Sequence, residues 1–241
     1  TTGANNVAVG YNALDANTTA SNNTAVGYAS LGANTTGDQN VAVGANAGLS
    51  VTTGIQNTLI GYLAGDALTD ADYNTALGTS ALTSDTLGSR AVAIGRNTLS
   101  SQNFTSATDN YNVAVGFSAG AAVTTGVQNT LIGGLAGDAL TEGFGNVALG
   151  YSALSSDTLG KRSVAIGHQA LLNQNFTSVT DVFNTAVGHE AGKQVTTGIQ
   201  NTLIGGLAGD ALTDADYNVA LGYLALSADT LGSRSIAIGY N

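Results

Sequence analysis

A short pattern of polar, β-branched and small residues recurs along the chain and predicts β-strands. Its core is Asn, a β-branched residue, Ala or Leu, an aliphatic residue and Gly, as in residues 6–10. In an extended chain Val7 and Val9 project from one face, and Asn6, Ala8 and Gly10 from the other. Helix is disfavoured because Gly follows nearly every aliphatic run and no 3.6-residue period persists. The chain is therefore predicted to be all-β.

The glycine that closes each core measures the repeat. Fourteen cores follow one another at 17-residue steps, except for two longer steps, from Gly95 to Gly116 and from Gly167 to Gly188. Three ordinary steps separate the two longer ones, so four types of coil follow one another in a fixed order. This periodicity predicts a β-solenoid of about fourteen coils that forms one domain over residues 1–241. The closing glycines are Gly10, Gly27, Gly44, Gly61, Gly78, Gly95, Gly116, Gly133, Gly150, Gly167, Gly188, Gly205, Gly222 and Gly239.

Two columns of identical polar residues support in-register stacking. A Thr stands eight residues after each closing Gly, with Asn103 and Asn175 replacing it in the long coils. The core Asn is present in eleven of fourteen cores and is replaced by Ala91, Ser163 and Ser235, always in the same coil type. Stacked, in-register strands place such residues where each can hydrogen-bond to its copy in the next coil.

The core motifs resemble a known repeat. They stand as NVAVG at residues 6–10, 40–44 and 112–116, as SVAIG at 163–167 and as SIAIG at 235–239. These resemble the YadA-like head repeat of trimeric autotransporter adhesins, and also N-T-A-x-G-x-x-A-L repeats of bacteriophage tail-fibre proteins. The resemblance covers essentially the whole chain. It implies a left-handed parallel β-roll and an intertwined homotrimer. Because the first residue is Thr1 and Asn241 follows shortly after a core strand, the chain is expected to be a fragment of a longer fibre protein.

The small-residue face of the core strand is predicted to form the trimer seam, because Ala and Gly let another backbone approach closely. In every fourth coil Leu replaces the expected Ala, which either closes a gap at the trimer axis or indicates a different packing. The coils are also longer than is usual in adhesin heads. The predicted seam residues are Ala8, Gly10, Ala42, Gly44, Leu59, Gly61, Leu131, Gly133, Leu203 and Gly205.

Composition and charge exclude several classes of partner. The chain has 33 Gly, no Pro, Cys, Met or Trp, and 43% apolar residues, enough to bury a core. Six Lys and Arg against sixteen Asp and Glu give a net charge of −10, which disfavours nucleic acids and anionic membranes. No apolar run approaches the roughly 18 residues of a spanning helix, so no membrane insertion is expected in this segment.

Aromatic residues are the candidates for receptor contact. The two long coils add four residues each, and insertions in solenoids often form binding loops. A second set follows the closing Gly and forms an aromatic column, which either contacts a sugar or protein receptor or packs on a neighbouring chain. The long loops could likewise lock adjacent protomers together. The candidate receptor-binding residues are Phe104, Tyr111, Phe176, Phe183, Tyr151 and Tyr223.

Catalytic and metal-binding chemistry have little support. His168 and His189 would be neighbours in the aromatic column, and a metal clamp formed by this pair is the alternative to a purely structural role. Tyr and Phe, which bind no metal of this kind, occupy most of that column elsewhere. Asp70 with Asp72 has the spacing of calcium ligands without an accompanying Gly-rich calcium repeat, so turn acids are the simpler interpretation. No metal, no cofactor and no enzymatic activity are predicted. Recurring pairs of acid and base suggest structural ion pairs or interchain contacts, namely Asp85 with Arg90, Asp157 with Arg162, and Asp229 with Arg234.

A structural and adhesive role follows as the leading hypothesis. The chain is expected to be part of a bacteriophage tail fibre that carries or presents host-receptor binding, with a glycan or protein on the host cell as partner. The alternative is the head of a bacterial trimeric autotransporter adhesin on the cell surface. An ice-binding solenoid and a polysaccharide-cleaving β-helix are weaker hypotheses, because the Thr array is interrupted and the acids simply repeat with the coils.

Overall fold

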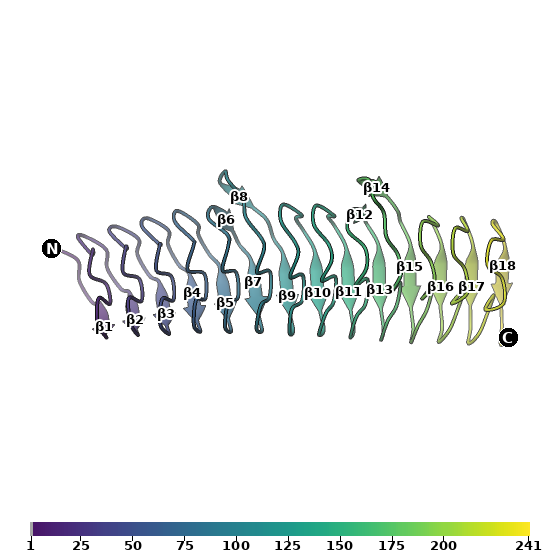
Figure 1. Ribbon diagram of the computed structural model, residues 1–241, viewed down its shortest axis with the longest axis horizontal. Helices are drawn as coiled ribbons and strands as arrows, with labels where there is room; N and C mark the ends of the chain where they lie inside the picture. The colour runs from purple at the N-terminus through teal and green to yellow at the C-terminus, as the bar shows by residue number, and fades with distance from the viewer. Residues whose placement is uncertain (1) are drawn as a thin grey trace. The chain divides into compact units, whose positions relative to one another are not determined.

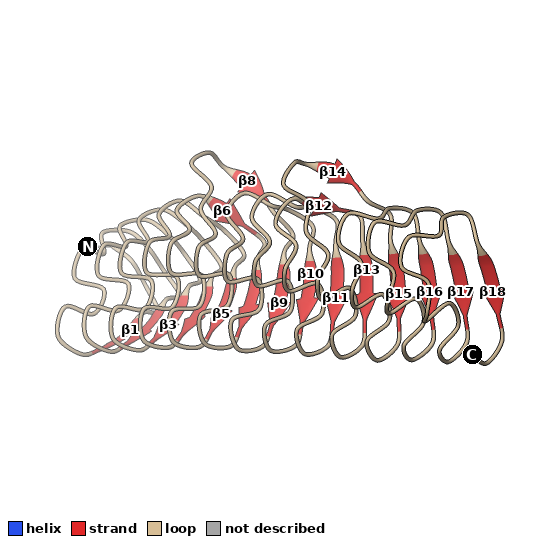
Figure 2. Ribbon diagram, turned by 45° about the vertical axis from the view of Figure 1, so that its right-hand side comes forward, coloured by secondary structure: helices blue, strands red, loops and turns tan. Residues whose placement is uncertain are grey.

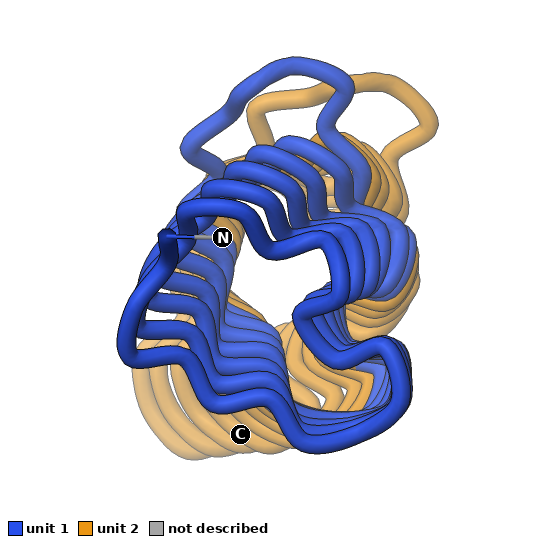
Figure 3. Tube along the Cα trace, turned by 90° about the vertical axis from the view of Figure 1, so that its left-hand side faces the viewer, with its two compact units in different colours: residues 1–118 blue, residues 119–241 orange. Residues whose placement is uncertain are grey.

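The computed structural model describes residues 2–241, and over that range it consists of short strands and turns without any helix (Figure 2). Accordingly, none of the described residues belongs to a helix of the length and apolar character that crossing a membrane would need. The chain divides into two compact units, residues 1–118 and 119–241 (Figure 3). Each unit is described by itself below.

Unit 1 is a stack of coils in which each core motif forms a three-residue strand (Figure 1). Successive core strands pair in parallel, and two shorter strands, β6 and β8, pair beside them. The core strands are β1 (Val7–Val9), β2 (Thr24–Val26), β3 (Val41–Val43), β4 (Thr58–Ile60), β5 (Thr75–Leu77), β7 (Val92–Ile94) and β9 (Val113–Val115). The short strands are β6 (Gly88–Ser89) and β8 (Thr108–Asp109).

Unit 2 repeats this architecture. Its core strands are also parallel, and β12 pairs with β14 as β6 pairs with β8. The core strands are β10 (Thr130–Ile132), β11 (Val147–Leu149), β13 (Val164–Ile166), β15 (Thr185–Val187), β16 (Thr202–Ile204), β17 (Val219–Leu221) and β18 (Ile236–Ile238). The short strands are β12 (Gly160–Lys161) and β14 (Thr180–Asp181). The prediction of an all-β, parallel β-solenoid with about fourteen coils is confirmed.

Register between neighbouring coils is one-to-one. Ala25 pairs with Ala42, and Ala42 pairs with Leu59 in the next coil. The longer step keeps this register, because Ala93 pairs with Ala114 across it. The four extra residues are therefore accommodated in the turn, and each strand position forms an unbroken column within its unit.

The middle residue of each core strand points into the coil of its own chain. Ala42, Leu59, Leu131 and Leu203 are fully buried, whereas the flanking β-branched and aliphatic residues are half-buried or exposed. These four side chains are therefore not available to a second chain, and the prediction that they line a trimer seam is wrong. Ala8 is exposed, and it lies in β1, the first strand of the sheet. The face that each unit leaves open is the one that carries the larger residues.

The closing glycines are required by the stacking itself. Gly61 has a φ of 137°, and a Cβ placed on it would lie 2.5 Å from the carbonyl oxygen of Gly78 in the next coil. Gly44, Gly133 and Gly205 have the same conformation and meet the next coil's backbone in the same way. A side chain at these positions would separate the coils, so contact within one chain accounts for the glycine column.

Leu in the strand centre is matched by Gly on the facing wall of the coil. A Cβ on Gly48 would lie 2.7 Å from Cδ1 of Leu59, and a Cβ on Gly65 would lie 2.7 Å from its Cδ2. Gly thus stands on this wall in the Leu59 coil and in the coil before it, whereas the other coils of the cycle carry Leu there, as at Leu31 and Leu82, both fully buried. The Leu in every fourth coil therefore fills the interior of its own coil, and does not close a gap at a trimer axis. The same match recurs in unit 2 among Leu203, Gly192 and Gly209.

The buried Asn column joins each strand to the next coil. Asn57 Oδ1 accepts a hydrogen bond of 2.9 Å from the backbone N–H of Asn74, and Asn57 Nδ2 donates one of 2.8 Å to the carbonyl of Ala71. Both bonds go to the turn that leads into the next strand. Burying an amide is costly unless its polar atoms are bonded, and here the repeat supplies partners for both the oxygen and the nitrogen of Asn57.

The Thr column also bonds between coils, but to the backbone. Thr18 Oγ1 donates to the carbonyl of Thr35 over 2.9 Å, and Thr141 Oγ1 donates to the carbonyl of Thr158 over 3.0 Å. The predicted hydrogen bonding along this column is present, although the acceptor is the next main chain and not the next hydroxyl. These hydroxyls are consequently engaged within the chain.

A double-mutant cycle tests the size match between Leu59 and Gly48. Leu59→Ala should destabilise the protein by about 2–5 kcal/mol, because it leaves a cavity. Gly48→Ala should cost about 1–3 kcal/mol in the natural chain, because the new methyl group overlaps Leu59. In the Leu59→Ala background the second substitution should cost clearly less, since the overlapping atoms are gone. Denaturant unfolding followed by circular dichroism measures all four chains.

Additive costs in this cycle would contradict the match. Backbone strain at Gly48 does not produce the coupling, because the same strain is present in both backgrounds and cancels in the cycle. Leu31 and Leu82 show that side chains are accommodated in this left-handed conformation at equivalent positions, with φ of 48° and 55°.

Candidate receptor-binding surface

Tyr or Phe follows seven of the fourteen closing glycines, and these exposed residues form an aromatic column that other residue types interrupt. Tyr11 and Tyr28 stack with ring centroids 5.6 Å apart and an interplanar angle of 11°. The tyrosines are about half exposed or more. Where two rings stack, each uses a face against its neighbour, and edges and hydroxyl groups remain for outside contacts. In unit 2, Tyr151 stacks on His168 at 5.7 Å, and Tyr223 stacks on Tyr240 at 5.6 Å.

A second exposed column precedes the core Asn and combines aromatic rings with arginine; we call it the arginine column. In unit 1, Arg90 lies over the ring of Tyr73 at 4.7 Å and within 6.0 Å of Tyr111. In unit 2, Arg162 lies 5.3 Å from the ring of Phe144 and 5.5 Å from that of Phe183. Cation–π attraction therefore holds Tyr111 and Phe183 in place while leaving about half of each ring exposed.

The arginines in this column pair with acids of the long coils. Arg90 Nε lies 2.9 Å from Asp109 Oδ2, and this hydrogen bond raises the pKa of Arg90 further above its ordinary value. Arg162 lies 2.6 Å from Asp181, which Lys161 also approaches at 3.2 Å. The expected pairing with Asp85 and Asp157 is wrong, because those two acids lie inside the coil. Arg234 instead stacks on Tyr217 at 5.6 Å.

Asp157 anchors the long coil of unit 2 from the inside. Its carboxylate accepts hydrogen bonds from Gln174 Nε2 at 2.6 Å, from the N–H of Gly160 at 3.0 Å and from the N–H of Phe176 at 3.2 Å. Asp85 makes the same three kinds of bond in unit 1. Burial raises the pKa of Asp157, while its hydrogen bonds act in the opposite direction.

Phe104 and Phe176 are interior residues. Only 6% and 7% of their surfaces are exposed, so the prediction that they contact a receptor is wrong. Each follows an exposed Asn and donates its backbone N–H to the buried Asp of the preceding coil. Phe104 and Phe176 anchor the base of each loop, so a receptor would contact the exposed residues that follow them in the loop.

The four extra residues of each long coil form a loop that ends in a short strand. In Figure 1 these loops project beyond the other turns beside β8 and β14. Residues 105–107 and 177–179 are exposed. Within each unit the loop places exposed residues next to the arginine column, because Asp109 and Asp181 belong to β8 and β14. The loop and the column thus form one surface per unit, and Tyr111 and Phe183 lie on it.

The acids with calcium-like spacing are occupied by hydrogen bonds between coils. Asp72 Oδ1 accepts from the N–H of Ile55 over 2.7 Å, and Asp70 accepts from the hydroxyl of Thr53. These contacts agree with the interpretation of turn acids. Asp214 and Asp216 make the equivalent contacts in unit 2.

Sequence reasoning missed the contribution of glutamine. Gln102 and Gln174 are fully buried, and each links the buried Asp of the preceding coil to the core Asn that follows, Asn112 or Asn184. The available signal was that Gln appears at this place only in the two long coils, directly after the coil that carries the buried Asp. In the core just before each long coil a smaller residue, Ala or Ser, replaces Asn, and Gln174 Nε2 donates to the hydroxyl of that residue, Ser163, over 3.0 Å.

Removal of the Asp157 carboxylate should destabilise unit 2 by roughly 2–4 kcal/mol, since three buried donors would lose their acceptor. Because burial raises its folded-state pKa, the folded chain holds the proton more tightly, and its contribution to stability falls as pH rises through that pKa. The cost of Asp157→Ala should therefore be larger near pH 4 than near pH 7. Thermal or denaturant unfolding at both pH values measures it.

Asp229→Ala is the matched control, because Asp229 occupies the same place in its coil and makes fewer of these bonds. Among the described residues its carboxylate accepts from the N–H groups of Leu231 and Gly232 alone, and it is partly exposed. Equal costs for the two substitutions would contradict the anchoring role of Asp157.

Comparison with known proteins returns no match: no family model, no curated protein and no solved structure is similar to this chain.

Proposed function

We propose that the chain is a structural and adhesive segment of a homotrimeric fibre, and that this fibre is a bacteriophage tail fibre that presents a host-receptor surface. In this role it performs no catalysis and needs no cofactor. The left-handed, intertwined β-roll implied by the repeat belongs to the same proposal. The partner would be a glycan or protein on the host cell.

The observation that carries this proposal is the uncovered apolar face of the parallel sheet in each unit. The third residue of every core strand points outward, and it is always Val, Ile or Leu. These residues are half-buried or exposed in the single chain. Parallel sheets are normally covered on both faces, so we expect a partner to cover this outward apolar face. The outward residues are Val9, Val26, Val43, Ile60, Leu77, Ile94 and Val115 in unit 1, and Ile132, Leu149, Ile166, Val187, Ile204, Leu221 and Ile238 in unit 2.

Two further copies of the same chain suit that face. A repeated apolar stripe is matched most simply by the same stripe with the same coil spacing, and symmetric homo-oligomers provide this match. The first strand position holds Thr in some coils and Val or Ile in others, so the stripe is less apolar on that side. The proposed seam therefore lies on the large-residue face, opposite to the face expected from residue size.

The loops and arginine columns support the adhesive part of the proposal. They expose aromatic edges, guanidinium groups and carboxylates next to each other, a combination suited to protein or glycan hydrogen bonding. Their repetition in the two units would give each chain two similar contact sites, and linked sites gain strength by multivalency.

The same features also suit a bacterial trimeric autotransporter adhesin, which remains the second candidate. Ice binding loses support, because the column hydroxyls of Thr18, Thr35, Thr52 and Thr69 donate to the next coil.

Solution mass tests the assembly. Sedimentation equilibrium should give three times the mass of one chain. Ile204→Asp should shift this mass toward the monomer, because it would bury a charge in the proposed seam. Ile204 is 37% exposed in the single chain, so the monomer itself should tolerate the change.

Gln200→Asp is the matched control, since it adds the same charge four residues earlier, at an exposed position of the arginine column. A monomeric natural chain, or a variant at Ile204 that keeps the full assembly, would contradict the proposed seam.

A further inference from the structure

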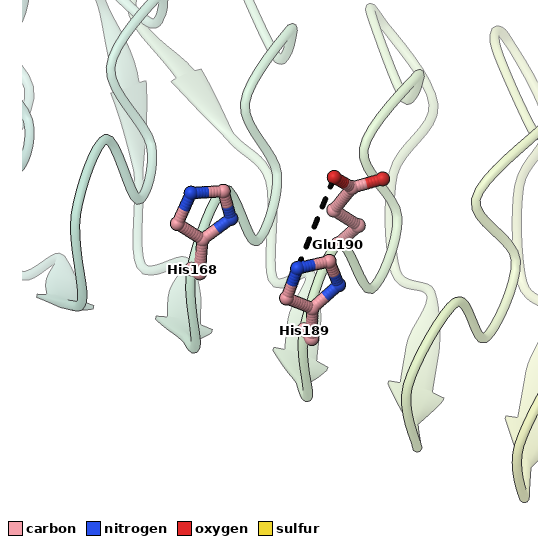
Figure 4. A group of neighbouring side chains, drawn as sticks. All are labelled: His168, His189 and Glu190. Atoms are coloured by element: carbon pink, nitrogen blue, oxygen red, sulfur yellow. Dashed lines mark ion pairs between the residues drawn. The ribbon is translucent and has the colours of Figure 1, made fainter.

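Three potential metal ligands converge at one point on the aromatic column of unit 2. His168 and His189 follow the closing glycines of β13 and β15, and Glu190 is the residue after His189 (Figure 4). One ligand atom from each residue lies within 4.8 Å of the others. The two imidazole rings stack with centroids 5.0 Å apart and an interplanar angle of 8°.

The fold brings these residues together by register. β13 and β15 are paired neighbours in which Ile166 pairs with Val187, so the residues two positions later lie side by side although a whole long coil separates them in sequence. The N–H of Glu190 donates to the carbonyl of His168 over 2.8 Å, which holds the carboxylate-bearing residue against the first histidine. The spacing therefore belongs to the backbone and does not depend on chance side-chain positions.

The coincidence of residue types is specific to this place. His168 and His189 are the two histidines of the whole chain, and they occupy adjacent coils of one column. The position two residues after the closing Gly is occupied fourteen times, by Asn, Ala, Leu, Ser or Gln, and by an acid only at Glu190. The acid thus stands only in a coil that carries a histidine.

We propose that His168, His189 and Glu190 form a binding site for a divalent transition-metal ion, with Zn²⁺ as the representative, that clamps two neighbouring coils of unit 2. Two imidazole nitrogens and one carboxylate oxygen suit Zn²⁺, Cu²⁺ or Ni²⁺, whereas Ca²⁺ and Mg²⁺ prefer oxygen ligands alone. Three protein ligands leave at least one coordination position open to water or to a group on a bound partner.

Binding requires a small rearrangement that the surface permits. The lone pairs of an imidazole lie in its ring plane, so two parallel rings must turn toward each other to share one ion. The His189 side chain is 62% exposed, so its ring is free to turn. Its Nε2 atom already lies 4.0 Å from Glu190 Oε1.

Lys193 is the competitor for the site. Its Nζ lies 3.2 Å from Glu190 Oε1, so the ammonium group occupies the carboxylate that a metal ion would use. If Glu190 is a ligand, removal of the Lys193 ammonium group should strengthen binding of the metal ion, although Lys193 is not itself a ligand. A site made of the two histidines alone would not respond to this change.

Calorimetric titration of the intact chain with ZnCl₂ tests the proposal, with CaCl₂ as the comparison. The expected result is one Zn²⁺ per chain, and no comparable Ca²⁺ binding. His168→Tyr and His189→Tyr should each weaken Zn²⁺ binding at least roughly tenfold, the smallest loss typical of removing even an indirect metal contact. Tyr is the conservative choice, because the column already holds Tyr151 and Tyr223. Glu190→Gln should also weaken binding, and Lys193→Met should strengthen it.

Absence of Zn²⁺ binding by the natural chain, or unchanged binding in both histidine variants, would overturn the proposal. A second pair of histidines, placed where no acid follows them, tests how much Glu190 contributes to Zn²⁺ binding. Tyr11→His with Tyr28→His, in the chain that lacks His168 and His189, creates a stacked pair next to Asn12 and Ala29, without an acid. Binding there as tight as in the natural chain would remove Glu190 from the site.

Discussion

Within each unit every coil stacks on the next through side chains and backbone that repeat at the same position, and this in-register stacking determines which residues each position can hold. Because equivalent positions lie next to each other, a residue type at one position has to be compatible with its copies in the neighbouring coils. A column of polar side chains can be buried only if every member finds a partner, and the Asn column finds it in the N–H of the next Asn and the carbonyl of the next turn. A column without such partners would leave many buried groups unsatisfied, at a cost of about 1–3 kcal/mol each.

The constraint also explains why residue size varies in a four-coil cycle. The interior of a thin coil holds little volume, so a Leu in the strand centre requires Gly on the facing wall, as with Leu59 and Gly48. Departures from the regular coil length are pushed outward into loops, while the strands on either side keep their register. The long coils then need an internal anchor, which Asp85 and Asp157 provide. Variation that could serve recognition is thereby confined to the surface.

Much of the fold could be predicted from the sequence because the pattern repeats. Glycine spacing indicated the coils, alternation indicated the strands, and the Asn and Thr columns indicated parallel register. Which face of each core strand points into the coil could not be predicted in the same way. Small residues suit either a close contact between chains or the interior of a narrow coil, and only the facing Leu and Gly columns decide between them. The predicted seam at Ala42 and Leu59 failed for this reason.

The candidate surface was predicted in part. Tyr111, Phe183, Tyr151 and Tyr223 are exposed in ordered columns, whereas Phe104 and Phe176 are buried. An insertion rich in aromatic residues does not reveal which ring turns inward, because that depends on the buried Asp from the preceding coil. The pairing of Arg90 with Asp109 was hidden for a similar reason. The partner acid belongs to the next coil and becomes a neighbour only through the extra length of that long coil.

Distances between spin labels report directly on whether the coils stack in register, and the absence of cysteine from the chain makes the labels unambiguous. Labelled cysteines that replace Asn22 and Arg90 are four coils apart. They should give a narrow distance distribution centred at about 19 Å, four strand spacings of about 4.8 Å. Cysteines at Gln39 and Tyr111 are separated by four more residues but by the same four coils, so they should give the same distance. Dilution with unlabelled protein removes distances between copies. A broad distribution, or a clearly longer distance for the second pair, would contradict in-register stacking across the long coil.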